Sequence, residues 1–290
     1  MTTRNWLLFL CATLLWGSSW SVVKVALGYV APLVFSFQQS IIVTGVLAPF
    51  LLVKPKQVPR DLKTLGHLLV YGLVSGVNVV VSNTGLVDES SGIGAMLTFT
   101  QPLLVFILSI GFLHEPANGR KLVGVLMGFV GIAILSIQPG THLYDVAPSS
   151  MLLIVGAFLW ASSTIYFKKY LAQVDIVVTT ALQFTISTVI LGFISVLVDG
   201  AIPFGFVFAD PIYQSLLFYN ALAVSVFGTV IWLFLLRRET ATNLSTYGFL
   251  IPVIALIVGW RMLNESFTLQ ALLGSMLILV SIYTVQKDAS

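Results

Sequence analysis

The sequence predicts an all-α integral membrane protein: ten transmembrane helices, arranged as two inverted five-helix repeats around a central cavity. Three observations lead there. Only 9% of the residues are charged, 58% are hydrophobic and the mean hydropathy is +1.01, whereas a soluble chain carries about 25% charged residues. The apolar residues gather in runs of about 20, the length that crosses a bilayer. Finally, the two halves of the chain repeat one pattern of motifs.

The ten expected spans leave only short connections between them and no room for a soluble domain. They cover residues 6–27, 32–53, 65–86, 91–113, 119–137, 151–171, 176–198, 212–236, 241–263 and 269–285. The first run follows a single basic residue, Arg4, and could be taken for a signal peptide. Its length and its two interior tryptophans favour a retained transmembrane helix instead.

Basic residues give the orientation. With a cytoplasmic N-terminus, 12 of the 14 Lys and Arg residues fall on the cytoplasmic side, and only Lys24 and Arg261 fall outside. Cytoplasmic connections attract Lys and Arg, so we expect a multi-pass protein of the plasma (cytoplasmic) membrane with both termini in the cytoplasm. The same scatter explains the net charge of +3 without a nucleic-acid partner; the expected partners are the lipid bilayer and a small-molecule solute. The oligomeric state stays open, and a monomer is compatible with the sequence.

The repeat is visible in the motifs. Residues 15–19, LWGSS, return as residues 159–163, LWASS, and Gln39 and Gln183 keep the same offset of 144. Pro102 and Pro252, like Glu115 and Glu265, are separated by 150 residues. Because each repeat holds an odd number of spans, the second enters the membrane from the opposite side, as in many secondary transporters. We place the first repeat in residues 1–143 and the second in residues 144–290.

These motifs, in this order and in both halves, resemble the drug/metabolite transporter superfamily, EamA type. The resemblance implies a ten-helix carrier with a central cavity, whose members often export amino acids or related metabolites. One position departs from the pattern, because the family commonly has an arginine early in the second helix where this chain has Gln39.

Prolines in the middle of the fourth and ninth spans predict helix breaks. Pro102 and Pro252 each remove one backbone hydrogen bond, and in lipid the freed carbonyl is tolerated only against protein or a water-filled cavity. Paired breaks in corresponding segments point to a transporter's binding site. We look first for substrate contacts beside the first break, at Thr98 and Gln101.

Other polar and aromatic side chains in mid-span are candidates for the same site, because they are unfavourable in lipid unless they face the bundle interior. The full set of predicted substrate-binding residues is Trp16, Ser19, Trp20, Gln39, Asn78, Thr98, Gln101, Trp160, Ser163, Gln183, Trp232 and Tyr247. A packing role is the alternative for the first helix, and interhelical hydrogen bonding is the alternative for Asn78 and Gln183.

Charged residues at span ends suggest structural roles. Lys24 and Lys168 can extend to the membrane interface, with substrate contact as the less favoured alternative. Glu115 and Glu265 precede the fifth and tenth spans, whose positive ends a carboxylate would stabilise. The glycine pairs Gly72/Gly76 and Gly124/Gly128 have the spacing of close helix packing.

The lack of charged residues in mid-span limits the expected coupling mode and the expected class of solute. All Asp, Glu and His residues lie at span ends or in connections, which favours uniport or exchange over coupling to a midplane proton carrier. No cluster of Lys and Arg is expected in the cavity to bind phosphate groups, so a neutral or zwitterionic metabolite such as an amino acid is expected. A nucleotide-sugar or phosphorylated-metabolite antiporter is the runner-up.

An intramembrane enzyme is the alternative from another class, and the sequence does not favour it. No His-Glu-x-x-His pair, nucleophile elbow or phosphate-binding loop is present. The one cysteine, Cys11, has no partner for a disulfide or a thiolate metal site. We therefore expect no enzymatic activity, no cofactor and no metal.

Overall fold

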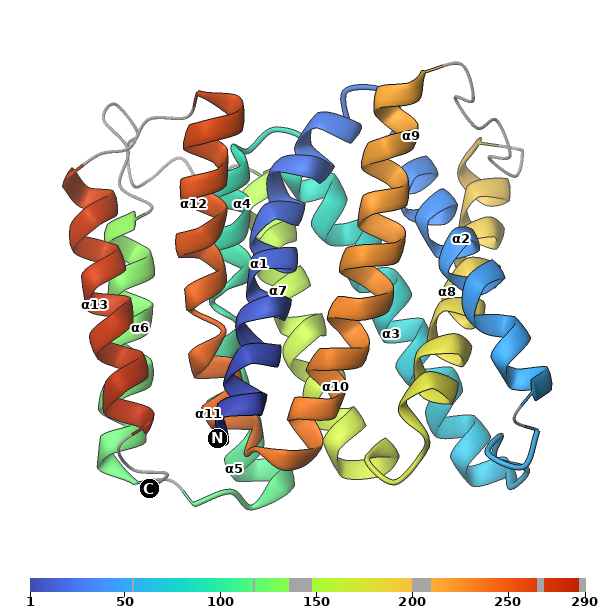
Figure 1. Ribbon diagram of the computed structural model, residues 1–290, viewed down its shortest axis with the longest axis horizontal. Coiled ribbons are helices and arrows are strands. Elements are labelled where there is room, and N and C mark those ends of the chain that lie inside the picture. Colours follow the sequence, from blue (N-terminus) through green and yellow to red (C-terminus); the bar gives the residue numbers. More distant parts are fainter. Residues whose placement is uncertain (54, 117, 136–147, 200–209, 265–268, 287–290) are drawn as a thin grey trace.

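The structure, a computed structural model, describes residues 1–53, 55–116, 118–135, 148–199, 210–264 and 269–286, and within them the chain is helical and contains no strand (Figure 1). The helices are α1 (Thr3–Ala26), α2 (Pro32–Val53), α3 (Leu62–Leu86), α4 (Ser91–Thr98), α5 (Gln101–Leu113), α6 (Gly119–Leu135), α7 (Pro148–Tyr166), η1 (Phe167–Leu171), α8 (Ile176–Asp199), α9 (Pro211–Phe218), η2 (Tyr219–Gly228), α10 (Thr229–Arg238), α11 (Ala241–Tyr247), α12 (Leu250–Leu263) and α13 (Leu269–Gln286). The segments η1 and η2 have the wider π-helical turn.

Seven helical segments of the described chain are long and apolar enough to cross a membrane. They correspond to the first, second, third, sixth, seventh, eighth and ninth expected spans. The fourth is divided into α4 and α5, while α6 and the apolar part of α13 are shorter than the other spans. The protein is thus a multi-span helical membrane protein. That the fourth, fifth and tenth expected spans also cross the membrane, for a total of ten crossings, remains a prediction.

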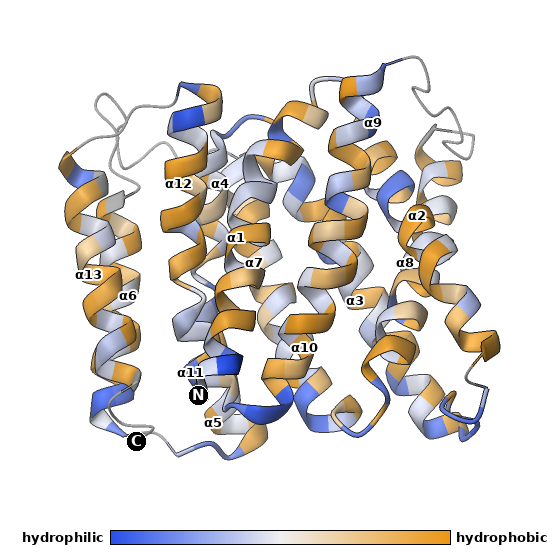
Figure 2. Ribbon diagram, in the orientation of Figure 1, coloured by the Kyte–Doolittle hydropathy of each residue, from blue (hydrophilic) through white to orange (hydrophobic). Residues whose placement is uncertain are grey.

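The helices form a bundle whose polar residues gather at its two ends and whose flanks are apolar (Figure 2). The bundle is assembled from segments distant in sequence: α1 packs on α12, α2 on α8, α3 on α7 and α8, and α6 on α13. The start of α1 and the end of α13 lie at the same end of the bundle (Figure 1). Large apolar side chains such as Leu52 and Phe193 are exposed on the flanks, as expected of a surface that faces lipid.

Close packing depends on glycines, as their spacing predicted. A Cβ on Gly72 would lie 2.7 Å from the Cβ of Ile186, and one on Gly124 would lie 2.4 Å from Cγ2 of Val285. At Gly131 the obstacle is backbone, since a Cβ would lie 2.9 Å from the carbonyl oxygen of Gly274. These contacts hold α3 to α8 and α6 to α13.

Aspartates begin several helices. Asp61 accepts a hydrogen bond from the Thr64 N–H at 2.8 Å, and this bond lowers the pKa of its carboxyl group. Asp210 accepts from the N–H groups of Ile212 and Tyr213 at 2.8 and 3.1 Å. Both side chains satisfy N–H groups that the first turn of a helix leaves without partners.

Lys24 and Lys168, 144 residues apart, bind the ends of equivalent helices. Lys24 Nζ donates to the carbonyl oxygens of Leu86 and Val87, at 3.1 and 2.6 Å, where α3 ends. Lys168 Nζ donates to the carbonyl oxygens of Leu236, at 3.0 Å, and Glu239, where α10 ends. A cation at a helix C-terminus is stabilised by the exposed carbonyl groups, so both lysines have a structural role.

The expectation for Glu115 was wrong in one respect. Its carboxylate does not cap α6, the helix that follows it in sequence. It accepts hydrogen bonds from the Ala241 N–H at 2.7 Å, the Thr242 N–H at 3.2 Å and the Thr242 hydroxyl at 2.8 Å, all at the start of α11. The backbone turns at His114, which has a φ of 54°, and the chain thereby brings the carboxylate to a helix far away in sequence. Glu265, its repeat counterpart, lies outside the described residues.

Candidate functional site

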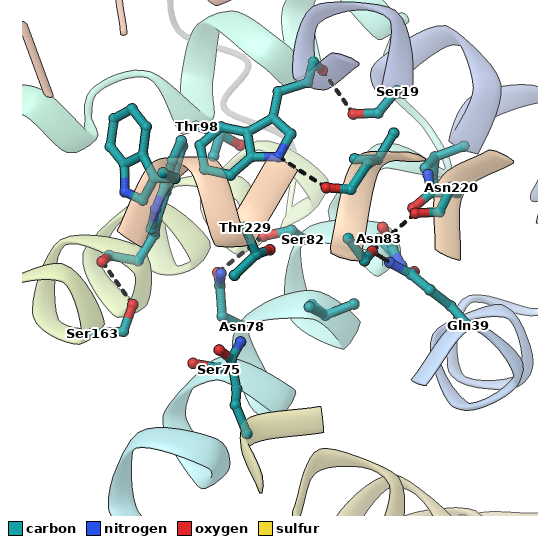
Figure 3. A pocket seen from close by; sticks show the side chains of 18 of the residues that line it. Ser19, Gln39, Ser75, Asn78, Ser82, Asn83, Thr98, Ser163, Asn220 and Thr229 are labelled. Carbon is teal, nitrogen blue, oxygen red and sulfur yellow. Dashed lines mark hydrogen bonds between the residues drawn. The ribbon is translucent and has the colours of Figure 1, made fainter. Parts of the chain in front are cut away.

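A cavity of about 240 Å³ is lined by residues of α1, α3, α7, α10 and neighbouring helices (Figure 3). Among the described residues, its lining contains no Asp, Glu, His, Lys or Arg. Neutral polar side chains line it instead: Ser19, Gln39, Ser75, Asn78, Ser82, Asn83, Thr98, Ser163, Thr164, Gln183, Asn220, Ser225 and Thr229. They come from both halves of the chain, so the cavity exists only when the two halves pack together.

Tryptophans form one wall of the cavity. The rings of Trp16 and Trp232 lie 5.0 Å apart between centroids, those of Trp16 and Trp160 5.5 Å, and those of Trp160 and Trp232 6.1 Å. Phe99 meets Trp160 edge to face at 5.2 Å. Trp16 is held in place because its Nε1–H donates to the carbonyl oxygen of Val224 at 3.4 Å. The ring faces of this wall are able to contact an apolar group or a cation.

The π-helical segment η2 supplies a second, polar wall. Ser225 Oγ donates to the carbonyl oxygen of Asn220, five residues earlier, at 3.0 Å, and it accepts from Gln39 Nε2 at 2.5 Å. The wider turn brings Asn220, Val224 and Ser225 to the cavity together. Such π-helical segments occur frequently at functional sites.

Amide groups of α3 complete the polar lining (Figure 3). Asn78 Oδ1 accepts from Ser82 Oγ at 3.2 Å, one helical turn further on. Asn83 Nδ2 donates to Ser36 Oγ of α2 at 2.9 Å. Asn78 and Asn83 therefore each form at least one hydrogen bond with another side chain of the protein.

Four buried polar atoms of the lining have no hydrogen-bond partner among the described residues. They are one acceptor, Gln183 Oε1, two donors, Asn220 Nδ2 and Trp232 Nε1, and one hydroxyl that can donate or accept, Thr98 Oγ1. Each belongs to a side chain that is at most 8% exposed. Buried polar atoms are nearly always hydrogen-bonded in proteins, so a cluster of unpartnered ones in a cavity indicates a place where a polar ligand can bind.

Both helix breaks border this site. The helix is interrupted at Phe99 and Thr100 between α4 and α5, and at Gly248 and Phe249 between α11 and α12. Pro102 therefore lies in the first turn of α5, where a backbone N–H would have no partner within the helix. Pro252 occupies the corresponding place in α12. Thr98 and Phe99 at the first break, and Ile251 after the second, line the cavity.

Ten of the twelve predicted substrate-binding residues line the cavity, and Gln101 and Tyr247 do not. Gln101 lies behind the lining and donates from Nε2 to Thr164 Oγ1 at 3.5 Å. Tyr247 packs on Trp6 and Phe9, with ring centroids 5.1 and 6.1 Å away, in the apolar core. Both residues lie in apolar helices, but their side chains do not line the cavity.

Several lining residues were missed by sequence reasoning. Ser75, Ser82, Thr164, Ser225 and Thr229 are small hydroxyl residues, which are common in membrane helices and often bond to their own backbone. Asn220 is the exception, since an asparagine in the middle of the eighth expected span was a signal of the same kind as Asn78. No group of three His, Cys, Asp or Glu side chains that could hold a metal ion occurs in the described part of the chain.

The membrane-length helices and the solute-sized polar cavity between them define a multi-span membrane protein of the class that carries small molecules across a bilayer. Comparison with protein families gives the particular family. Residues 4–137 and, again, residues 148–286 match the EamA-like transporter family, and the chain belongs to this family. The resemblance of the motifs is thereby confirmed.

Known relatives are transporters as well. The chain is 30% identical to the uncharacterized transporter YvbV of Bacillus subtilis (strain 168), over 99% of this chain and 93% of the relative. It is 27% identical to a probable amino-acid metabolite efflux pump of Salmonella typhimurium (strain LT2), over 98% and 95% of the two chains. A solved crystal structure covers 100% of this chain, and 98% of its own, with a TM-score of 0.79 and 16% identity, which shows a shared fold. Family and relatives indicate a transporter rather than an enzyme.

Proposed function

We propose that the protein exports small neutral or zwitterionic metabolites, amino acids above all, by alternating access of the central cavity. The observation that carries the proposal is the cavity lining, in which the described residues combine unpartnered neutral donors and acceptors with a tryptophan wall and include no charged side chain. A zwitterion needs both donors and acceptors and brings its own compensating charges. The name of the Salmonella relative, an amino-acid metabolite efflux pump, supports the same class of solute and the outward direction.

The cavity also argues against the runner-up, a nucleotide-sugar or phosphorylated-metabolite antiporter. A phosphate group is bound most strongly by Arg and Lys side chains, and the lining contains neither. A volume of about 240 Å³ lies below the roughly 300–1,000 Å³ of typical small-molecule pockets, which favours an amino acid over a nucleotide joined to a sugar.

Uniport or exchange is the proposed mode of coupling. Proton relays in membrane proteins use buried Asp, Glu or His, and the cavity lining has none of them. Two other carboxylates have partners outside the cavity. Glu89 accepts hydrogen bonds from the hydroxyls of Ser149 and Ser150, and Glu239 forms an ion pair with the N-terminal ammonium. Strong solute accumulation driven only by an imposed pH gradient would contradict this mode.

For the architecture, we infer ten crossings in two inverted repeats, residues 1–143 and 144–290, with both termini cytoplasmic in the plasma membrane. Contacts between residues 144 positions apart support it, because equivalent residues that touch must lie near the axis that relates the repeats. Thr44 Oγ1 and Thr188 Oγ1 lie 3.1 Å apart, and the rings of Trp16 and Trp160 are also in contact. The two separate family matches add support.

Counterflow in proteoliposomes tests the proposed function. Vesicles containing the purified full-length protein and unlabelled amino acid are diluted into a trace of the labelled amino acid, with labelled nucleotide sugars in parallel vesicles. We expect amino-acid uptake that Trp232→Phe reduces severalfold, because the variant loses an indole N–H of the cavity. Trp260→Phe, on the exposed flank of α12, serves as the matched control. Counterflow of the nucleotide sugar alone would favour the runner-up.

A further inference from the structure

Gln39 and Gln183 occupy equivalent positions in the two repeats, 144 residues apart, and both line the cavity. Their equivalent positions in the repeats and their shared place in the cavity lining therefore suggest one common role. Their hydrogen bonding differs, however, and the difference separates a structural amide from one that is available to a solute.

Gln39 is committed to the protein. Its Nε2 donates to Ser225 Oγ at 2.5 Å, and the same hydroxyl donates to the carbonyl oxygen of Asn220 at 3.0 Å. This chain joins α2 to the π-helical segment η2. Figure 3 draws Gln39 and Asn220 among the residues that line the cavity.

Gln183 has no such arrangement. The residue that corresponds to Ser225, at the offset of 150, is Ser75, which also lines the cavity. Nevertheless Gln183 Oε1 has no partner among the described residues, although the side chain is only 8% exposed. Gln183 thus combines a place in the cavity lining with a buried side-chain oxygen that has no partner among the described residues, whereas the amide of Gln39 is held through its Nε2–H.

The surroundings identify the chemistry of the missing partner. The unpartnered hydroxyl of Thr98 can also accept a hydrogen bond, while Asn220 Nδ2 and Trp232 Nε1 are unpartnered donors among the described residues. A lone cation in a cavity without any charged side chain would be uncompensated. A zwitterion carries its own counter-charge, so its ammonium group can use the acceptors while its carboxylate uses the donors.

We propose that Gln183, and not Gln39, contacts the solute, and that its side-chain oxygen accepts a hydrogen bond from the ammonium group of a zwitterionic amino acid. The inference rests on the proposed function for its class of solute. It assigns the two equivalent glutamines different roles: Gln39 fixes η2, and Gln183 selects solutes that have an amino group.

Binding to the purified full-length protein, followed by its tryptophan fluorescence, tests the inference separately from transport. The probes are L-leucine, L-phenylalanine and L-threonine, each paired with the acid that lacks only the amino group: 4-methylpentanoate, 3-phenylpropanoate and 3-hydroxybutanoate. Gln183→Met removes the acceptor at similar size, and Gln39→Met is the matched control. Gln183→Glu retains an acceptor at the same place.

We expect Gln183→Met to weaken binding of the amino acids at least about tenfold, the loss typical of a hydrogen bond to a charged group, while binding of the paired acids changes less than about twofold. Gln39→Met should affect both members of each pair equally, and Gln183→Glu should keep the preference for the amino group. An equal loss for both members in Gln183→Met, a selective loss in Gln39→Met, or a wild-type protein that binds no amino acid overturns the inference. A wild-type protein that binds amino acids with these variant effects but does not carry them overturns the proposed function alone.

Discussion

Replacement of Glu115 by alanine tests the contact that joins the two halves of the chain at one end of the bundle. The carboxylate binds the first two N–H groups of α11, those of Ala241 and Thr242, and the Thr242 hydroxyl. The third N–H, of Asn243, is bound by the hydroxyl of Thr240. Every residue of α11 is buried, so water cannot easily replace the lost acceptor.

The magnitude follows from the groups left without partners. A buried N–H without an acceptor costs about 1–3 kcal/mol, and Glu115→Ala leaves two of them, at residues that are 0% and 1% exposed. The lost carboxylate at a helix N-terminus adds roughly 0.3–1 kcal/mol. We expect a loss of about 3 kcal/mol in the free energy of unfolding. Glu115→Gln, which keeps one acceptor oxygen without the charge, should lose about 1 kcal/mol.

The assay is unfolding in mixed detergent micelles, followed by far-UV circular dichroism, with Asp88→Asn at an exposed acid as the control. A double-mutant cycle with Thr242→Val isolates the contact, because Thr242 Oγ1 is bound by both Glu115 and Ser109. We expect a coupling energy of about 1 kcal/mol. Glu115→Ala within about 0.5 kcal/mol of wild type, or additive effects in the cycle, would refute the assignment of Glu115 as the cap of α11.

Three further changes have defined outcomes. Gly131→Ala should lower the unfolding midpoint, since the new Cβ would lie 2.9 Å from the Gly274 carbonyl oxygen. The control is Gly45→Ala, whose Cβ would have no heavy atom within 4 Å and which should raise helix stability by about 0.5–1 kcal/mol. Equal effects of the two variants would contradict the packing of α6 on α13. Lys168→Met should loosen the end of α10, detected as faster amide hydrogen exchange there than in wild type, and unchanged exchange would exclude the lysine cap. Thr98→Val, nearly isosteric, should weaken amino-acid binding severalfold with little change in the unfolding midpoint, and a variant that binds as wild type would remove Thr98 from the site.

The sequence alone predicted the class of protein and most of the residues that line the cavity. The cost of transferring polar groups into lipid depends on local composition, so apolar runs marked the spans and mid-span polar residues marked most of the cavity lining. The prolines at positions 102 and 252 marked the two helix breaks for an equally local reason, because a proline constrains its own turn. The repeated motifs gave the family, which the family comparison confirmed.

Roles that depend on a partner from a distant segment were beyond the sequence. Glu115 was expected to cap the next helix, yet its partners lie 126 and 127 residues away. Gln101 is beside the proline break, but its amide points to Thr164 rather than to the cavity. In each case the side chain's partner is set by helix rotation and packing, and neither is a property of the segment itself.

Gln39 and Gln183 show most clearly which features the sequence determines and which the tertiary structure decides. Sequence determined that Gln39 and Gln183 occupy equivalent mid-span positions, because the offset of 144 and the apolar surroundings are both written in the chain. Only the tertiary structure decided that one is bonded to Ser225 and the other has an unpartnered oxygen in the cavity. The reason is that a hydrogen bond requires two groups within about 3 Å, and which groups meet at that distance is decided by how α2, α8 and η2 pack together.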